Sequence, residues 1–136
     1  RLREGSALLT LSYLGAVRFV PNYNTMGLAK ASLEASVRFL AQSLGARGVR
    51  VNAISPGYTL TEALQAAIDR GDRDPTDLMS QAAMGRLVEP HEVAVAVGFL
   101  LSPVASAITG ANLPVDAGWL AGSTWQTYGG VPPIKG

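Results

Sequence analysis

Cysteine is absent from this sequence, and His91 is its only histidine. Without thiols the chain can form neither disulfide bonds nor thiolate metal sites, and no cysteine nucleophile is available. A single imidazole is also too few for an ordinary zinc site, which takes several nitrogen or sulfur ligands. We therefore expect no metal centre.

Charge is also scarce. Only 15% of the residues are charged, and the formal net charge is +1. So weak a field favours neither nucleic acid nor an anionic membrane as a partner. The hydrophobic fraction of 48% and the mean hydropathy of +0.21 exclude an intrinsically disordered chain. A length of 136 residues is typical of one domain, and we expect a single unit over residues 1–136.

Long apolar runs are missing too. Residues 93–101 form the longest one, about half of the roughly 20 residues that a membrane-spanning helix needs. The N-terminal residues Arg1, Arg3 and Glu4 are charged, and no signal-peptide cleavage pattern follows them. We expect a cytoplasmic protein. Because the chain starts at Arg1 and not at Met, we also expect it to be the C-terminal part of something longer.

Three short segments have the pattern of strands in a parallel sheet. Residues 7–12 are an apolar run that ends before Gly15. In residues 49–54, apolar and polar side chains alternate before a Ser-Pro-Gly break. Residues 111–116 form the third segment. We expect each of them to be a strand.

The segment 24–44 has the spacing of a long helix. Apolar residues recur along it at intervals of three to five positions: Leu28, Leu33, Val37, Leu40 and Leu44. Gly45 is its expected end.

Two start signals predict shorter helices further along the chain. Asp74 is a plausible N-cap with Pro75 in the first turn, and residues 89–92 open an apolar helix that ends near Leu101. Residues 119–136 lack periodicity, so we expect a C-terminal tail there. Its aromatic residues are expected at a subunit interface, namely Trp119, Trp125 and Tyr128.

The order strand, helix, strand, two helices, strand predicts an α/β fold with a parallel sheet and right-handed crossovers. The glycine-rich G-x-G-x-x-G turn of dinucleotide-binding folds does not occur in the sequence. If this is a Rossmann-type fold, its phosphate-binding half is absent.

Tyr23 and Lys30 lie seven residues apart, about 20° short of two full helical turns. They therefore share one helix face, and the long lysine side chain can reach back toward the tyrosine. An ammonium close to a phenol stabilises negative charge at the phenolic oxygen, which suits an acid or oxyanion donor. The alternative is that Tyr23 packs at the helix entrance while Lys30 is solvated.

The residues around this pair resemble a known family. The segments SYLGA (12–16), PNYN (21–24) and MGLAKASLEA (26–35) are similar to NADH-dependent enoyl-acyl-carrier-protein reductases of fatty acid biosynthesis. These enzymes belong to the short-chain dehydrogenase/reductase superfamily. At the usual tyrosine and serine positions of that superfamily this chain has Met26 and Tyr13. The resemblance extends over residues 5–51.

The resemblance implies a role for each residue of the set. Tyr23 would contact the thioester carbonyl as it becomes an enolate. Lys30 would hold the nicotinamide ribose of NADH or NADPH, and Tyr13 would line the substrate site. The chain would correspond to the last three strands of the superfamily's Rossmann-type sheet, and the complete protein would be a tetramer.

Residues 51–119 resemble the wider superfamily. In the segment VNAISPGYTLT (51–61), the resemblance places Pro56, Gly57, Thr59 and Thr61 beside the cofactor. A Pro-Gly break after a strand also exposes backbone polar groups at the edge of the sheet where ligands bind. Leu60 and Leu64 belong to an apolar helical stripe that could cover an acyl chain, or could be ordinary core.

Three functions remain open at this point. The first is reduction of an enoyl thioester, favoured by Tyr13, Tyr23 and Lys30. The second is an ordinary alcohol dehydrogenase or carbonyl (3-oxoacyl) reductase, favoured by residues 51–119 and disfavoured by Met26. The third is an inactive fragment or assembly module, because the cofactor phosphate site is missing.

Overall fold

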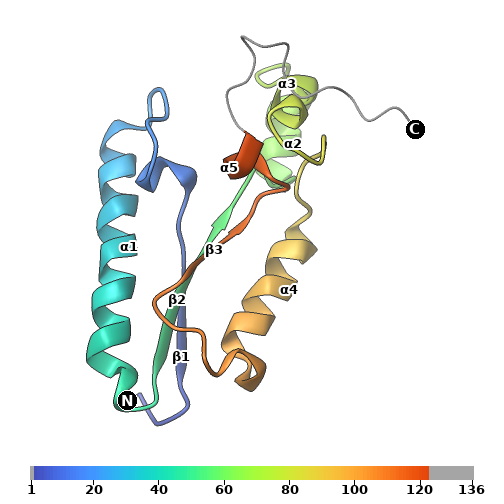
Figure 1. Ribbon diagram of the computed structural model, residues 1–136. Helices are drawn as coiled ribbons and strands as arrows, with labels where there is room; N and C mark the ends of the chain where they lie inside the picture. The colour runs from blue at the N-terminus through green and yellow to red at the C-terminus, as the bar shows by residue number, and fades with distance from the viewer. Residues whose placement is uncertain (1, 123–136) are drawn as a thin grey trace. The chain divides into compact units, whose positions relative to one another are not determined.

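A computed structural model describes residues 2–122 of the chain (Figure 1). Its elements are, in order, β1 (Ala7–Leu11), η1 (Leu14–Ala16), α1 (Asn24–Gly45), β2 (Arg50–Pro56), α2 (Glu62–Asp69), α3 (Pro75–Ser80), α4 (Pro90–Leu101), η2 (Pro103–Ala105), β3 (Asn112–Val115) and α5 (Trp119–Gly122). The predicted strands and the helices beginning at Asn24, Pro75 and Pro90 are confirmed.

The chain forms two compact units. The first comprises Arg1–Ser55 and Ala94–Pro114, and the second comprises Pro56–Val93 and Val115–Gly136. The single unit expected over residues 1–136 stays a prediction.

The strands form a parallel sheet in the order β1-β2-β3. Ala7 pairs with Arg50, and Leu11 pairs with Ile54, at the two ends of the β1–β2 register. Along β2 and β3, the hydrogen bonds Ala53 N to Ala111 O (2.8 Å) and Gly57 N to Val115 O (3.0 Å) keep one offset, as parallel strands require. The predicted α/β fold with a partial Rossmann-type sheet is therefore confirmed.

The core of the first unit lies between α1 and the sheet. Val51 and Ala53 of β2 pack against Val37 and Ala41 of α1, with Leu8 and Leu44 at the margin. Figure 1 shows α1 running along β1 and β2. Each fully buried valine of this kind contributes about 1.5–3 kcal/mol relative to an exposed one.

The buried stripe of α1 differs in part from the predicted one. It consists of Glu34, Val37 and Ala41, whereas Leu28 is 74% exposed and Leu40 is 44% exposed. The helix carries apolar residues on more than one side, and spacing alone does not decide which stripe faces the sheet. A glutamate therefore occupies a buried position that the pattern had not assigned to it.

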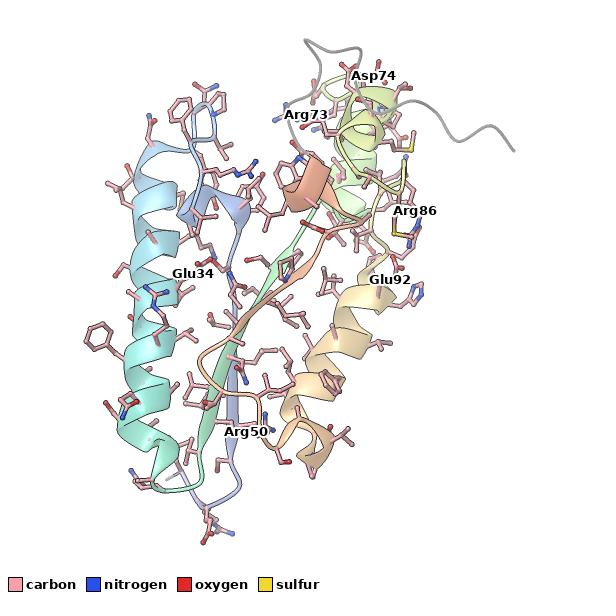
Figure 2. All side chains as sticks on the ribbon, viewed as in Figure 1. Glu34, Arg50, Arg73, Asp74, Arg86 and Glu92 are labelled. Carbon is pink, nitrogen blue, oxygen red and sulfur yellow. The ribbon has the colours of Figure 1, made fainter. Side chains whose placement is uncertain are left out.

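Arg50, at the start of β2, holds the end of α4 and the loop after it. Its guanidinium donates to the carbonyl oxygens of Leu100 (2.7 Å), Ser102 (3.0 Å) and Ile108 (3.3 Å) (Figure 2). The last carbonyls of a helix have no intrahelical partner, and Arg50 satisfies that of Leu100 in α4 together with two carbonyls of the chain that follows the helix.

In the second unit, α3 begins as predicted, since the Asp74 carboxylate accepts a hydrogen bond from Thr76 N (2.8 Å). Trp119 is buried within its own chain, where its ring lies 4.4 Å from that of Tyr58. This corrects the prediction of a subunit-interface position for Trp119. The Asp116 carboxylate caps the short helix α5 through Leu120 N (2.8 Å). The interface positions predicted for Trp125 and Tyr128 lie outside the described residues.

A bidentate ion pair in the second unit links Arg86 to Glu92 (Figure 2). The two terminal guanidinium nitrogens of Arg86 donate to the Glu92 carboxylate at 2.8 Å, and Glu89 N donates to it at 2.9 Å. The hydrogen bond from Arg86 has the largest effect and that from Glu89 N the next largest. They lower the pKa of Glu92 from 4.5 to about 2. As the pH falls, the Glu92 carboxylate therefore takes up a proton at a higher pH in the unfolded chain than in the folded chain.

From this difference we expect a pH-dependent loss of stability. The contribution of Glu92 is fully present above about pH 4.5 and is lost as the pH falls toward 2. Thermal unfolding followed by circular dichroism should show a smaller drop in Tm over this interval for Glu92→Gln than for the unchanged chain. The control Glu4→Gln, at an exposed position, should keep the original slope, and an equal slope for Glu92→Gln would contradict the prediction.

Candidate active site

The first unit brings Tyr13 and Tyr23 together. Tyr13 follows the end of β1, and Tyr23 immediately precedes the first turn of α1. Their ring centroids lie 4.9 Å apart with an interplanar angle of 56°. Asn22 has a φ of 62°, a left-handed conformation that asparagine tolerates, and it turns the chain into the helix. The tyrosine pair thus forms where a strand end meets a helix start.

Glycine at position 15 leaves the space that the Tyr23 ring occupies. A Cβ atom at Gly15 would lie 2.4 Å from Cδ1 and 2.5 Å from Cε1 of Tyr23. At Gly27 an added Cβ would lie 3.0 Å from the carbonyl oxygen of Gly15. The two glycines therefore let the ring and the η1 backbone approach α1 closely.

Lys30 bonds to the end of the neighbouring strand. Its side chain is partly buried, and Nζ donates to the carbonyl oxygen of Leu11 at 2.8 Å. An ammonium carries three N–H donors, and this bond occupies one of them. Lys30 is therefore held beside the strand end that leads to Tyr13, and this is not the arrangement of a freely solvated lysine.

An open groove borders Tyr23 on the α1 side. It has a volume of about 270 Å³, and its apolar lining includes Val17, Val20 and Leu28. Small-molecule sites are concave and mostly apolar with a few polar groups, and this groove has Tyr23 at its wall.

The sequence pattern gave no role to the buried carboxylate of Glu34 (Figure 2). Glu34 follows Lys30 by four residues on α1. Its Oε1 accepts from Ser12 Oγ (2.5 Å) and from Asn112 Nδ2 (2.8 Å). Ser55 Oγ in turn donates to Asn112 Oδ1 at 3.0 Å. Glu34 lies on the same helical stripe as Val37, but spacing alone does not show that this stripe is the buried one.

The residues predicted beside the cofactor begin the second unit. Gly57 has a packing reason to be glycine, since an added Cβ would lie 2.7 Å from the Cα of Asp116. Thr59 Oγ1 donates to Gly57 O at 3.1 Å, and Thr59 forms an isolated bridge with Val88. Pro56 is the last residue of β2. These contacts shape a tight turn directly after the strand.

Thr61 and the two leucines lie on or next to α2. The Thr61 hydroxyl accepts from Leu64 N at 3.2 Å and so caps this helix. Leu60 and Leu64 are both partly buried. Burial raises the pKa of the neighbouring residue Tyr58, and the positive charge of Arg73 partly offsets this rise. The predicted cofactor and substrate roles of Pro56, Gly57, Thr59, Leu60, Thr61 and Leu64 stay predictions.

Two classes of feature are absent from residues 2–122. No group of three or more histidine, aspartate or glutamate side chains there could hold a metal ion. In the same part of the chain, no helix combines the length and apolar character needed to cross a bilayer.

Comparison with known sequences places this constellation in a family. The family model for enoyl-(acyl carrier protein) reductase matches residues 1–120. The NADH-dependent enoyl-acyl-carrier-protein reductase FabI of Nostoc sp. is 51% identical over 119 residues, which make up 87% of this chain and 45% of the relative. FabI of Escherichia coli is 46% identical over 122 residues, with the same two shares. The similarity to enoyl reductases thus continues beyond residue 51.

Solved structures give the same fold. A Brucella melitensis chain described as ribose-5-phosphate isomerase superposes with a TM-score of 0.85 at 40% identity, and the match covers 93% of this chain and 49% of the other. ElxO with NADP bound has a TM-score of 0.80 at 28% identity, covering 85% of this chain and 46% of ElxO.

Each match covers most of this chain but only about half of the other protein. The chain covers about half the length of the curated relatives it matches, 45% for both the Nostoc and the E. coli enzymes. Within that half, the family match runs from residue 1 to residue 120 and includes Tyr13, Tyr23 and Lys30. The chain therefore belongs to the enoyl-(acyl carrier protein) reductase family.

Proposed function

We propose that this chain supplies the catalytic residues of an NAD(P)H-dependent oxidoreductase that reduces enoyl thioesters in fatty acid biosynthesis. The observation that carries the proposal is the packing of Tyr13 on Tyr23, with Lys30 fixed to the strand end beside them. The family match and the names of the relatives support the same reaction.

Each of the two units, taken by itself, offers groups that suit a nicotinamide cofactor. Lys30 has N–H donors beyond the one it gives to Leu11 O, and these suit the hydroxyls of the nicotinamide ribose. The turn from Pro56 to Thr59 offers backbone groups at a strand end. The sequence has no G-x-G-x-x-G turn, so the cofactor phosphates need residues other than such a turn.

The proposed reaction divides the work between cofactor and protein. When bound, the reduced nicotinamide supplies hydride to the β-carbon of the enoyl thioester. The Tyr23 hydroxyl donates a hydrogen bond to the thioester oxygen as negative charge develops on it, which lowers the barrier. The Tyr13 ring keeps that of Tyr23 in place, and the Lys30 ammonium adds positive charge to the same end of the helix. The apolar groove offers a place for the acyl chain.

Two other reactions are tested by the same assay. A carbonyl reductase would reduce a 3-oxo thioester, although the side chain at the usual tyrosine position is that of Met26, which has no hydroxyl. The Brucella neighbour is described as a sugar-phosphate isomerase, and interconversion of an aldose and a ketose consumes no reduced nicotinamide. Consumption of NADH with a defined thioester therefore separates the three.

The experiment compares this chain alone with a joined protein. In the joined protein, the 136 residues are fused to the part of the Nostoc enzyme that they do not match. Both are titrated with NADH and NADPH by calorimetry and then assayed with crotonyl and 3-oxobutyryl thioesters. The unmatched Nostoc part alone is the background control. Lys30→Met in the joined protein tests the ribose contact.

We expect the joined protein to bind NADH or NADPH and to reduce the crotonyl thioester. Lys30→Met should weaken cofactor binding. Reduction of the 3-oxo thioester only would contradict the role of Tyr23 and establish the carbonyl-reductase alternative. No binding by the chain alone would mean that the cofactor site is completed by residues outside these 136.

The proposal extends to assembly and cellular place. We propose that the complete protein is a cytoplasmic tetramer that binds an acyl thioester. Support for assembly comes from exposed apolar side chains in the second half of α1, where Phe39 is 73% and Leu40 is 44% exposed. Sedimentation of the joined protein tests the tetramer, and a monomer at micromolar concentration would contradict it.

A further inference from the structure

Glu34 is a buried charged residue that the proposed reaction does not use. Its residue exposure is 8%, and that of its partner Ser12 is 5%. Figure 2 shows the Glu34 side chain reaching from α1 toward the strands. A carboxylate removed from water is unfavourable unless its oxygens are hydrogen-bonded. The chain therefore retains a group here that an apolar residue could replace if packing alone were needed.

The carboxylate acts as a hydrogen-bond acceptor. Its Oε1 receives the hydroxyl of Ser12 at 2.5 Å and the amide of Asn112 at 2.8 Å, both neutral donors. The ion pairs in the described part of the chain are Arg70–Asp72 and Arg86–Glu92, and neither involves Glu34. Lys30, one turn earlier on the same helix, bonds to the backbone of β1.

Ser12 connects Glu34 to the candidate site through the backbone. It lies between Leu11, whose carbonyl oxygen holds Lys30, and Tyr13, whose ring packs on Tyr23. Ser12 N donates to Ile54 O at 2.7 Å, so the residue is fixed to the sheet on one side and to α1 on the other. Loss of the Glu34 acceptor would remove the side-chain anchor of this segment on α1, while the backbone bond to Ile54 would remain.

We propose that Glu34 is a positioning residue, which through Ser12 fixes Leu11 O and Tyr13 and so holds Lys30 and the tyrosine pair in their working arrangement. Asn112 adds a second anchor from β3. This inference rests on the proposed function only for its effect on catalysis. The placement of the tyrosine rings is a structural property and can be measured without turnover.

Three variants of the joined protein test the proposal. Glu34→Gln keeps a side-chain oxygen that can accept hydrogen bonds from Ser12 and Asn112. Glu34→Met removes both side-chain oxygens but keeps a side chain of similar length. Val37→Ala is the matched control, because it removes buried volume from the same stripe of α1 without touching Ser12. For each, Tm, kcat and KM are measured, together with the NMR resonances of ¹³C-labelled tyrosine rings assigned by Tyr13→Phe and Tyr23→Phe.

We expect Glu34→Met to shift the Tyr13 and Tyr23 resonances and to lower kcat about 10- to 100-fold, the effect of misplaced catalytic groups. Glu34→Gln should keep both readouts close to the original. Val37→Ala should lower Tm without moving the tyrosine signals. Equal resonances and kcat for Glu34→Met and Val37→Ala at matched Tm would overturn the proposal, and so would a loss in Glu34→Gln as large as in Glu34→Met.

The two proposals fail in different ways. If the joined protein reduces no enoyl thioester, the proposed function is wrong, while the tyrosine resonances still decide the role of Glu34. If it reduces the thioester and Glu34→Met leaves the resonances and kcat unchanged, only the positioning role is wrong.

Discussion

Tyr23→Phe should lower kcat/KM for the crotonyl thioester about 10²- to 10³-fold, the usual cost of removing one donor to a developing oxyanion. The substitution removes the hydroxyl but keeps the ring that packs 4.9 Å from Tyr13, so the fold and its Tm should change little. Steady-state kinetics of the joined protein give the first quantity, and thermal unfolding gives the second.

The control for this loss is Ser80→Ala. It removes a hydroxyl at the end of α3 that donates to the carbonyl oxygen of Asp77 at 2.8 Å and has no part in the proposed reaction. We expect its kcat/KM to stay within about threefold of the original, well below the loss that removal of an oxyanion donor causes. Equal losses in the two variants would contradict the assignment of Tyr23 as the donor.

Gly15→Ala should abolish most activity for a steric reason. The new methyl would lie 2.4 Å from Cδ1 of Tyr23, far inside van der Waals contact, so the ring must leave its place. Displacement of a catalytic group by about 1 Å can reduce the rate about 10²-fold. Because a partly buried side chain can move more easily than backbone, Tm should fall much less than activity does.

Gly98→Ala is the control for the same chemical change. Apart from its chain neighbours and the nearby backbone of its own helix α4, no described atom lies within 4 Å of an added Cβ at Gly98. Alanine is favoured over glycine inside a helix by about 0.5–1 kcal/mol, so this variant should be slightly more stable and fully active. If Gly15→Ala left the activity and the Tyr23 resonances unchanged, the added methyl group would not displace the Tyr23 ring, and the prediction would be wrong.

The elements of this fold could be predicted where local patterns coincide with packing. Asp74 caps α3 as its sequence position indicated, and the break at Pro56 ends β2. Trp119 escaped prediction because its one-turn helix depends on tertiary contacts, with Tyr58 stacked on the ring and Asp116 capping the backbone. The periodicity of the sequence does not predict such tertiary contacts.

The candidate site could be predicted in part for a similar reason. Tyr23 and Lys30 lie on one helix, so their spacing brings them to a common face. The bond from Lys30 to Leu11 O and the approach of Tyr13 depend on how β1 packs beside α1. Glu34 was overlooked because its partner Asn112 is 78 residues away, and no local pattern announces such a partner.

The long reach of these polar contacts has a consequence for how the protein folds. Arg50 binds carbonyl groups 50 to 58 residues further along the chain. Helices form from local contacts within about a microsecond, whereas closing large loops and pairing parallel strands is slow. An early state would therefore contain α1 with Tyr23 and Lys30 in register, but without the strand ends that position them. The contact from Glu34 to Asn112, which spans 78 residues, ties the candidate site to these late events. The arrangement of Tyr13, Tyr23 and Lys30 should therefore be complete only when the whole sheet has formed.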